Sequence, residues 1–265
     1  MADTLEERLA RILPGGKGVW VPMDHGISGY PETGLESMDS LVEAVISGGA
    51  DAIVLHKGAL SHHVDATGWG GFVCHVSAST VHGGTRSQSK VSVATAEECW
   101  QRGAMALSGQ VNLGDEAESE MIADLGSLTT ESFPLGLPVL GMVYPRGPNL
   151  NLSKGDETGG VAHAARLAWE LGCHVVKVPW TGSSDSFRRV TEAVPIPVLI
   201  AGGPSDIPFA DTLAIVEQAM SAGGAGVCMG RQVFGSQDPS AHVAALRKLV
   251  HEGTSATDAA ASLRG

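Results

Sequence analysis

A lysine lies within a short apolar run, His174-Val175-Val176-Lys177-Val178-Pro179-Trp180. The run is rich in β-branched residues, which is typical of a buried parallel strand. Burial disfavours the charged form of a lysine, so we expect a lowered pKa for Lys177. A neutral amine can attack a carbonyl carbon and form a Schiff base. Lys177 is therefore a candidate nucleophile, with a solvated lysine at a strand tip as the alternative.

A second lysine, Lys57, also follows an apolar segment. Gly58 and a polar loop come directly after it, so we expect its ammonium group to be solvated. Lys177 lies between two valines instead, which favours Lys177 as the reactive amine.

Other polar residues also come where apolar segments end. They are Asp24-His25, His56-Lys57, His75, Gln110, Tyr144-Pro145-Arg146, Gly202-Gly203 and Gly230-Arg231. If the segments are parallel strands, these ends meet at one face, where βα loops build an active site. Strand ends also lie where the chain meets water, so a single polar residue there indicates little. The active site is indicated by polar residues at the ends of many strands together.

Two of these ends predict a phosphate site. Gly202-Gly203 and Gly230-Arg231 follow the seventh and eighth apolar segments, positions where barrels commonly bind phosphate on backbone N–H groups. Arg231 would add a bidentate contact. Two tight turns and a surface arginine are the alternative.

Three histidines at neighbouring strand ends require a test for a metal site. His25, His56 and His75 occur singly, without HxH or HExxH spacing. We therefore expect no catalytic metal.

A regular alternation of strands and helices must position these residues. The apolar segments lie at residues 18–23, 51–55, 72–76, 104–108, 138–143, 174–180, 197–201 and 225–229. Helical patterns, such as residues 34–47 and 157–171, separate most of them. Residues 59–70 are predicted as a loop with at most a short helix, and residues 82–89 as a polar loop.

This alternation predicts a single domain over residues 1–265, a closed (β/α)8 TIM barrel. A doubly wound open sheet is the alternative. Thr4 and Glu7 have capping-box spacing, which predicts an extra N-terminal helix ahead of the barrel.

The composition of the chain excludes some classes of partner and predicts its cellular compartment. The net charge of −12 argues against nucleic acid or an anionic membrane surface, so an anionic substrate would need local positive groups. The four cysteines form no CxxC pair, which is typical of reduced thiols. No signal peptide is apparent, and no apolar run approaches the ~20 residues of a membrane span. We expect a soluble, cytoplasmic protein.

Several motifs recur in an order that resembles a known family. They are Pro22-Met23-Asp24-His25-Gly26, Leu55-His56-Lys57-Gly58, Ser77-Ala78-Ser79-Thr80, Val111-Asn112-Leu113-Gly114, Tyr144-Pro145-Arg146-Gly147, Val176-Lys177 with Thr181-Gly182, Ala201-Gly202-Gly203-Pro204 and Gly230-Arg231. As an ordered set they resemble the archaeal-type class I aldolases. The resemblance is closest to the 2-amino-3,7-dideoxy-D-threo-hept-6-ulosonate synthase branch, whose relatives include 2-amino-4,5-dihydroxy-6-oxo-7-(phosphooxy)heptanoate synthases.

The resemblance implies roles for individual residues. Lys177 would form the Schiff base, Tyr144 would be the general acid/base, and Asp24 would assist proton transfer near the amine. The Gly202-Gly203 and Gly230-Arg231 loops would hold the substrate phosphate. The family also implies a barrel that needs no metal and no nicotinamide, so we expect no cofactor. Members are commonly homo-oligomers built from rings, so an assembly such as a decamer is expected.

Two further residues complete the expected site. His25 is placed with the substrate-binding residues. Arg146 follows Tyr144 by two residues, so on an extended backbone both side chains would point to the same side. A guanidinium there would suit the carboxylate of aspartate semialdehyde. A salt bridge to a neighbouring loop is the alternative for Arg146.

The sequence departs from the family pattern at three places. Met142 stands where the fructose-bisphosphate aldolases of this group usually have a tryptophan, which weakens the glycolytic interpretation. Gln110 replaces an expected histidine. Trp180 stands where a tyrosine is expected ahead of Thr-Gly.

The predicted function is a Schiff-base aldolase or transaldolase that joins a phosphorylated ketose donor to an aldehyde acceptor, aspartate semialdehyde, for aromatic biosynthesis. The donor would be dihydroxyacetone phosphate or a 6-deoxy-5-ketofructose 1-phosphate type compound. The alternatives are a fructose-bisphosphate aldolase, a thiolase of the same superfamily, and a phospho-ligand-binding barrel that has lost catalysis.

Overall fold

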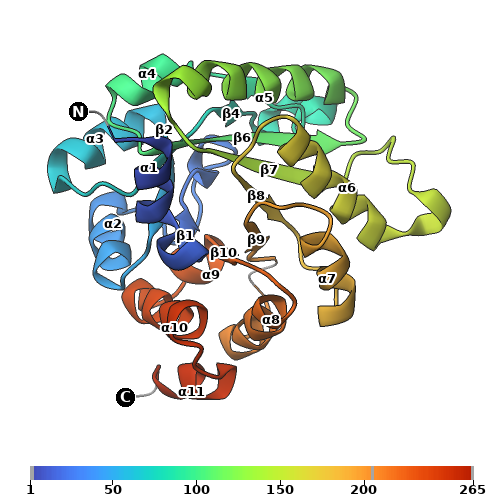
Figure 1. The fold of residues 1–265 in the computed structure, drawn as a ribbon. Helices are drawn as coiled ribbons and strands as arrows, with labels where there is room; N and C mark the ends of the chain where they lie inside the picture. The colour runs from blue at the N-terminus through green and yellow to red at the C-terminus, as the bar shows by residue number, and fades with distance from the viewer. Residues whose placement is uncertain (1–2, 204–205, 264–265) are drawn as a thin grey trace.

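Eight parallel strands close into a barrel. The structure is a computed structural model that describes residues 3–203 and 206–263. The strands pair in the order β1-β10-β9-β8-β7-β6-β3-β2, and β2 pairs with β1 again (Figure 1). They are β1 (Gly18–Pro22), β2 (Ala52–His56), β3 (Phe72–His75), β6 (Ala106–Leu113), β7 (Val139–Pro145), β8 (Val175–Val178), β9 (Val198–Ala201) and β10 (Gly226–Cys228). The predicted (β/α)8 barrel is confirmed, and the open sheet is wrong.

Most of the helices surround the strands on the outside of the barrel, whereas α1 (Leu5–Ile12) packs against the cluster inside it (Figure 1). The other helices are α2 (Met38–Ser47), α3 (Lys57–Thr67), α4 (Ala96–Gln101), α5 (Glu118–Ser132), α6 (Glu157–Glu170), α7 (Ser184–Thr191), α8 (Phe209–Ser221), α9 (Arg231–Phe234), α10 (Pro239–Glu252) and α11 (Ala256–Ala261). Short 3₁₀ turns are η1 (Pro14–Gly16), η2 (His25–Ile27), η3 (Val81–Arg86), η4 (Phe133–Leu135) and η5 (Ser153–Gly155). Within the described ranges, the helices are too short or too polar to cross a bilayer.

The extra N-terminal helix is present and has the predicted cap. The Thr4 side chain accepts a hydrogen bond from the Glu7 backbone, and the Glu7 side chain accepts one from the Thr4 backbone. The indole of Trp20 donates to the Ile12 carbonyl oxygen at 2.7 Å. Ile12 and Trp20 are both fully buried in the cluster inside the barrel, so α1 is anchored to it.

Side chains alternate between two layers along each strand. On β8, Val175 belongs to the cluster inside the barrel, whereas Val176 and Val178 pack outward against the helices. Both faces of each strand are therefore buried, which is why the strand sequences are continuously apolar. Lys177 has the same parity as Val175, so its side chain points into the barrel.

Three segments differ from the prediction. Residues 57–67 form α3, because Leu60 and His63 bury one side of this segment although the sequence has little periodicity. Helix α2 begins at Met38, four residues later than expected. The predicted polar loop after β3 contains η3 and lies inside an antiparallel hairpin of β4 (Ser77–Ala78) and β5 (Val91–Ser92).

Candidate active site

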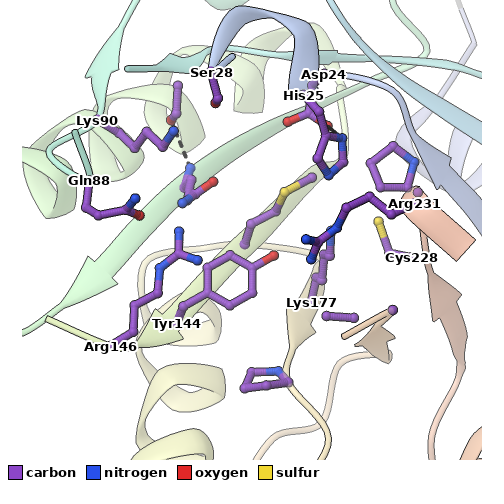
Figure 2. Close-up of a pocket in the computed structure, with 18 of the residues that line it drawn as sticks. Asp24, His25, Ser28, Gln88, Lys90, Tyr144, Arg146, Lys177, Cys228 and Arg231 are labelled. Atoms are coloured by element: carbon purple, nitrogen blue, oxygen red, sulfur yellow. Dashed lines mark hydrogen bonds and ion pairs between the residues drawn. The ribbon is translucent and has the colours of Figure 1, made fainter. Parts of the chain in front are cut away.

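One cavity contains all nine residues that the sequence marked as catalytic or substrate-binding. Its volume is about 410 Å³, and it opens where the strands end. The nine residues are Asp24, His25, Tyr144, Arg146, Lys177, Gly202, Gly203, Gly230 and Arg231. They come from β1, β7, β8, β9, β10 and the loops that follow these strands, and their side chains converge (Figure 2).

Lys177 lies at the inner wall of the cavity with 7% of its surface exposed. Burial lowers the pKa of its ammonium group, but Cys228, Tyr144 and Asp24 raise the pKa more strongly, so that it lies above its ordinary value. The lowered pKa expected from the sequence is therefore wrong, because an apolar strand hides which charges face its lysine. The resting form is the ammonium, which must lose a proton before it can attack a carbonyl.

Tyr144 is the other reactive group beside Lys177. Strand β7 runs two residues further than predicted, so Tyr144 pairs with Asn112 of β6 inside the sheet. Burial raises the pKa of the phenol and nearby Lys177 opposes this, with a net rise. Tyr144 therefore keeps its proton at neutral pH. The Arg146 guanidinium lies 4.7 Å from the Tyr144 ring centre, which confirms that both side chains point to the same side.

Asp24 follows β1 and faces the cavity with 17% of its side chain exposed. Burial alone would raise the pKa of its carboxyl, but His75, His25 and Lys177 together hold the pKa well below its usual range. Burial keeps the pKa of His75 at about 3, so this histidine is neutral at pH 7. Lys177, whose pKa is raised, is charged at pH 7 and so helps to keep Asp24 ionised.

The three strand-end histidines do not converge as metal ligands. Nδ1 of His75 lies 2.7 Å from the hydroxyl of Ser108, and the His56 ring packs edge-on against His75 with the ring centres 5.2 Å apart. Among the described residues, the group with three ligand atoms within 4.8 Å of one another is Asp39, His62 and His63. That group lies on α2 and α3, away from the cavity.

The two loops that predicted a phosphate site lie side by side. Nη2 of Arg231 donates to the Gly203 carbonyl oxygen at 3.0 Å and so joins the loops after β9 and β10. A Cβ atom on Gly230 would lie 2.4 Å from the Pro22 carbonyl oxygen, so this position requires glycine. Pro204, the end of the motif, lies outside the described residues.

A buried asparagine that sequence reasoning missed organises the opposite side of the cavity. Asn112 is fully buried, and its Oδ1 accepts hydrogen bonds from Arg146 Nε at 2.9 Å and Gln110 Nε2 at 3.0 Å. Its Nδ2 donates to the Gln88 carbonyl oxygen at 2.6 Å. Asn112 therefore fixes the Arg146 guanidinium and the loop before β5 together. The available signal was two polar residues, Gln110 and Asn112, on the inner face of a strand.

Two other cavity residues were also missed. Lys90 comes from the loop before β5, and Cys228 ends β10 beside Lys177. Burial raises the pKa of the Cys228 thiol to about 11, so the thiol is neutral at pH 7. The rival amine, Lys57, does not line the cavity. It is the first residue of α3, and its Nζ lies 3.1 Å from a Glu98 carboxylate oxygen.

Comparison with known proteins identifies the family. Residues 19–236 match the model of the DeoC/LacD family aldolases. The chain is 40% identical over 233 residues to 2-amino-4,5-dihydroxy-6-oxo-7-(phosphonooxy)heptanoate synthase of Streptomyces griseus, covering 87% of this chain and 84% of that one. It is 36% identical over 247 residues to 2-amino-3,7-dideoxy-D-threo-hept-6-ulosonate synthase of Halobacterium salinarum, covering 92% and 91%.

A solved structure agrees with the sequence relatives. An archaeal fructose-1,6-bisphosphate aldolase, with its catalytic lysine bound to a carbinolamine intermediate, matches with a TM-score of 0.80 and 27% identity, over 93% of this chain and 99% of that chain. The prediction of an enzyme is confirmed over that of a barrel without catalysis. The chain belongs to the DeoC/LacD family of aldolases and is a class I aldolase, which works through a lysine Schiff base.

Proposed function

We propose that this aldolase joins a donor derived from a ketose phosphate to L-aspartate 4-semialdehyde, giving an amino-heptulosonate-type product for aromatic biosynthesis. The donor is dihydroxyacetone phosphate or a 6-deoxy-5-ketofructose 1-phosphate type compound. The observation that carries the proposal is one buried amine, Lys177, set beside a protonated phenol and an ionised carboxylate in a cavity with cations at both sides.

Lys177 forms the covalent intermediate in this proposal. Its amine attacks the donor ketone, and water leaves to give a protonated imine. Loss of a proton, or of a carbon fragment, next to the imine carbon produces an enamine, because the imine accepts the electron pair. The enamine carbon then attacks the aldehyde of the acceptor. Hydrolysis of the new imine releases the product and restores the amine.

Asp24 and Tyr144 manage charge and protons during these steps. The protonated imine is a cation in a buried site, and the nearby Asp24 carboxylate offsets the cost of that burial. Oδ1 of Asp24 is buried and accepts no hydrogen bond from the described residues, so it is open to receive a proton near the amine. Tyr144 holds its proton at neutral pH and can donate it to the alkoxide that forms on the acceptor.

The cations divide the cavity between donor and acceptor. Arg231, with the Gly202-Gly203 turn, binds the donor phosphate, while Arg146 binds the acceptor carboxylate next to Tyr144. Because Asn112 occupies Nε of Arg146, the two terminal nitrogens of the guanidinium remain for a bidentate contact. The arrangement supplies the local positive charge that an acidic protein needs to attract anionic substrates.

The three departures from the family pattern fall at different distances from this chemistry. Met142 and Gln110 line the cavity, and Met142 pairs with Lys177 across the sheet. Both can therefore shape the acceptor space. Trp180 instead packs against Phe187, with ring centres 5.2 Å apart, and lines a separate hollow near α6. We infer that Trp180 affects specificity less than Met142 does.

The test is a product assay with purified enzyme. Each donor is incubated with L-aspartate 4-semialdehyde, and products are identified by mass spectrometry. Formation of the seven-carbon amino product supports the proposal. Cleavage of fructose 1,6-bisphosphate at a higher kcat/KM than any such condensation would support the alternative aldolase function, which the 27% identical archaeal structure favours.

We also propose that the enzyme is a ring-based homo-oligomer. Family resemblance and the exposed Phe133 on η4 support this. Light scattering should then give a mass several times 27.2 kDa, whereas the mass of a single chain would contradict the proposal.

A further inference from the structure

Lys90 is a buried lysine that the proposed chemistry leaves without a role. Only 8% of its surface is exposed, and that part faces the cavity. The next residue, Val91, pairs with Ala78 in the β4–β5 hairpin. The preceding Ser89 donates from its hydroxyl to the Asp115 carboxylate at 2.8 Å. The backbone on both sides of Lys90 is therefore fixed, and its side chain reaches the cavity from a defined position.

The Lys90 ammonium has no close ion-pair partner among the described residues; the Asp24 carboxylate acts on it only from a distance. Its side chain makes no hydrogen bond or ion pair with any described residue, although a buried charge is costly unless paired. Its pKa is lowered by burial and then by the Arg146 guanidinium, with Asp24 opposing both. Arg146 is more exposed than Lys90; its Nε donates to the neutral amide of Asn112, and the Asp115 carboxylate acts on it without forming an ion pair. Lys90 and Arg146 are neighbouring cations, one of them buried, and they repel each other. An anion bound between them would stabilise both charges.

This cationic pair is separate from the phosphate loops. Figure 2 shows Lys90 and Arg146 along one side of the cavity and Arg231 on the opposite side, with Tyr144 between them. A donor whose phosphate lies at Arg231 and whose ketone reaches Lys177 leaves the Lys90 side for the second substrate. An anion bound at Lys90 would therefore belong to the acceptor.

We propose that Lys90 and Arg146 together form an anion subsite that selects acceptor aldehydes with a negatively charged group at the end away from the aldehyde. This inference rests on the proposed function, and it adds Lys90 as a specificity-determining residue. Asn112 holds Arg146 in a fixed orientation for a planar anion, whereas the longer, unbonded Lys90 side chain can follow the shape of the ligand. Carboxylate and phosphate share this chemistry, and the experiment distinguishes them.

The experiment compares Lys90→Met and Lys90→Arg with wild type. Methionine keeps most of the length and removes the charge. The acceptors are L-aspartate 4-semialdehyde, glyceraldehyde 3-phosphate and uncharged propionaldehyde. We expect Lys90→Met to lower kcat/KM for an anionic acceptor by about 10- to 100-fold. This factor corresponds to the loss of a hydrogen bond to a charged group. The propionaldehyde rate stays unchanged, and Lys90→Arg restores most of the loss. If kcat/KM falls more for L-aspartate 4-semialdehyde, the subsite binds a carboxylate; if it falls more for glyceraldehyde 3-phosphate, the subsite binds a phosphate.

A matched control and a stability measurement separate binding from structure. Lys57→Met removes a lysine that is ion-paired with Glu98 outside the cavity, and it should leave acceptor selectivity unchanged. Lys90→Met should melt at or above the wild-type Tm, because it removes an unpaired buried charge. Equal losses on charged and uncharged acceptors, together with a lowered Tm, would make Lys90 structural and overturn the inference.

The donor half-reaction distinguishes this inference from the proposed function. Borohydride trapping with the donor alone should be the same in Lys90→Met and wild type. If wild type itself is not trapped, the proposed function fails whatever Lys90 does. Normal trapping with unchanged selectivity in Lys90→Met refutes the acceptor subsite alone.

Discussion

Replacing Tyr144 by phenylalanine removes one hydroxyl group and keeps the aromatic ring. The ring still fills its place on β7, with the Arg146 guanidinium 4.7 Å from its centre. The hydroxyl is buried beside Lys177, and a net hydrogen bond of this kind is worth about 1 kcal/mol. We therefore expect Tyr144→Phe to fold normally and to change the free energy of unfolding by no more than about 1 kcal/mol.

The effect on catalysis should be much larger than the effect on stability. A positioned general acid contributes about 10²- to 10⁴-fold in rate, which corresponds to about 2.7–5.5 kcal/mol at the transition state. The phenol is needed when the acceptor alkoxide takes up its proton, whereas the imine forms on Lys177. Tyr144→Phe should thus lower kcat by this factor while the donor is still trapped on the enzyme by borohydride.

The chain supplies a matched control, because its two tyrosines are Tyr30 and Tyr144. Tyr30 is 66% exposed, so Tyr30→Phe should keep full activity. In that variant the ultraviolet absorbance of phenolate reports Tyr144 alone. Its raised pKa predicts that the phenol ionises above the ordinary value of about 10. Ionisation below that value, or full activity in Tyr144→Phe, would refute the assignment.

Three further predictions concern the phosphate loops and the absence of a metal. Arg231→Ala should lower kcat/KM for the phosphorylated donor by an amount that corresponds to about 1.5–3 kcal/mol of transition-state stabilisation. An unchanged kcat/KM would rule out the contact between Arg231 and the phosphate. Gly230→Ala should destabilise the fold by about 1–3 kcal/mol in urea unfolding, because its Cβ would lie 2.4 Å from the Pro22 carbonyl oxygen. If Gly230→Ala is as stable as wild type, the backbone of β1 can move away from the added Cβ at little energetic cost. Activity should survive EDTA; loss in EDTA with recovery in zinc would show that a metal is required.

The sequence predicts most of the barrel because its strands are buried on both faces. Such strands are short apolar runs, and their ends mark the active face directly. Helix α3 was missed because its helical state depends on packing rather than on periodicity: Leu60 and His63 alone are buried along it. The β4–β5 hairpin was missed because each strand has two residues, too few for a pattern.

The candidate residues were found where local sequence carries the signal. Lys177 stands out as a charge in an apolar run, and Arg146 is readable from its spacing to Tyr144. Lys90 has no such signal, since contacts distant in sequence, such as Ser89 with Asp115, set its position. The pKa of Lys177 was misjudged for the same reason. The groups that raise it, Cys228 among them, arrive from other strands.

The most direct test of the proposed mechanism is to find which lysine forms the covalent bond to the donor. The enzyme is incubated with dihydroxyacetone phosphate and reduced with borohydride, and its peptides are analysed by mass spectrometry. We predict that the donor mass is found on the peptide containing Lys177, and that Lys177→Met is neither labelled nor active. Lys57→Met should be labelled as wild type is. Label on Lys57 or Lys90, with activity retained in Lys177→Met, would contradict the account.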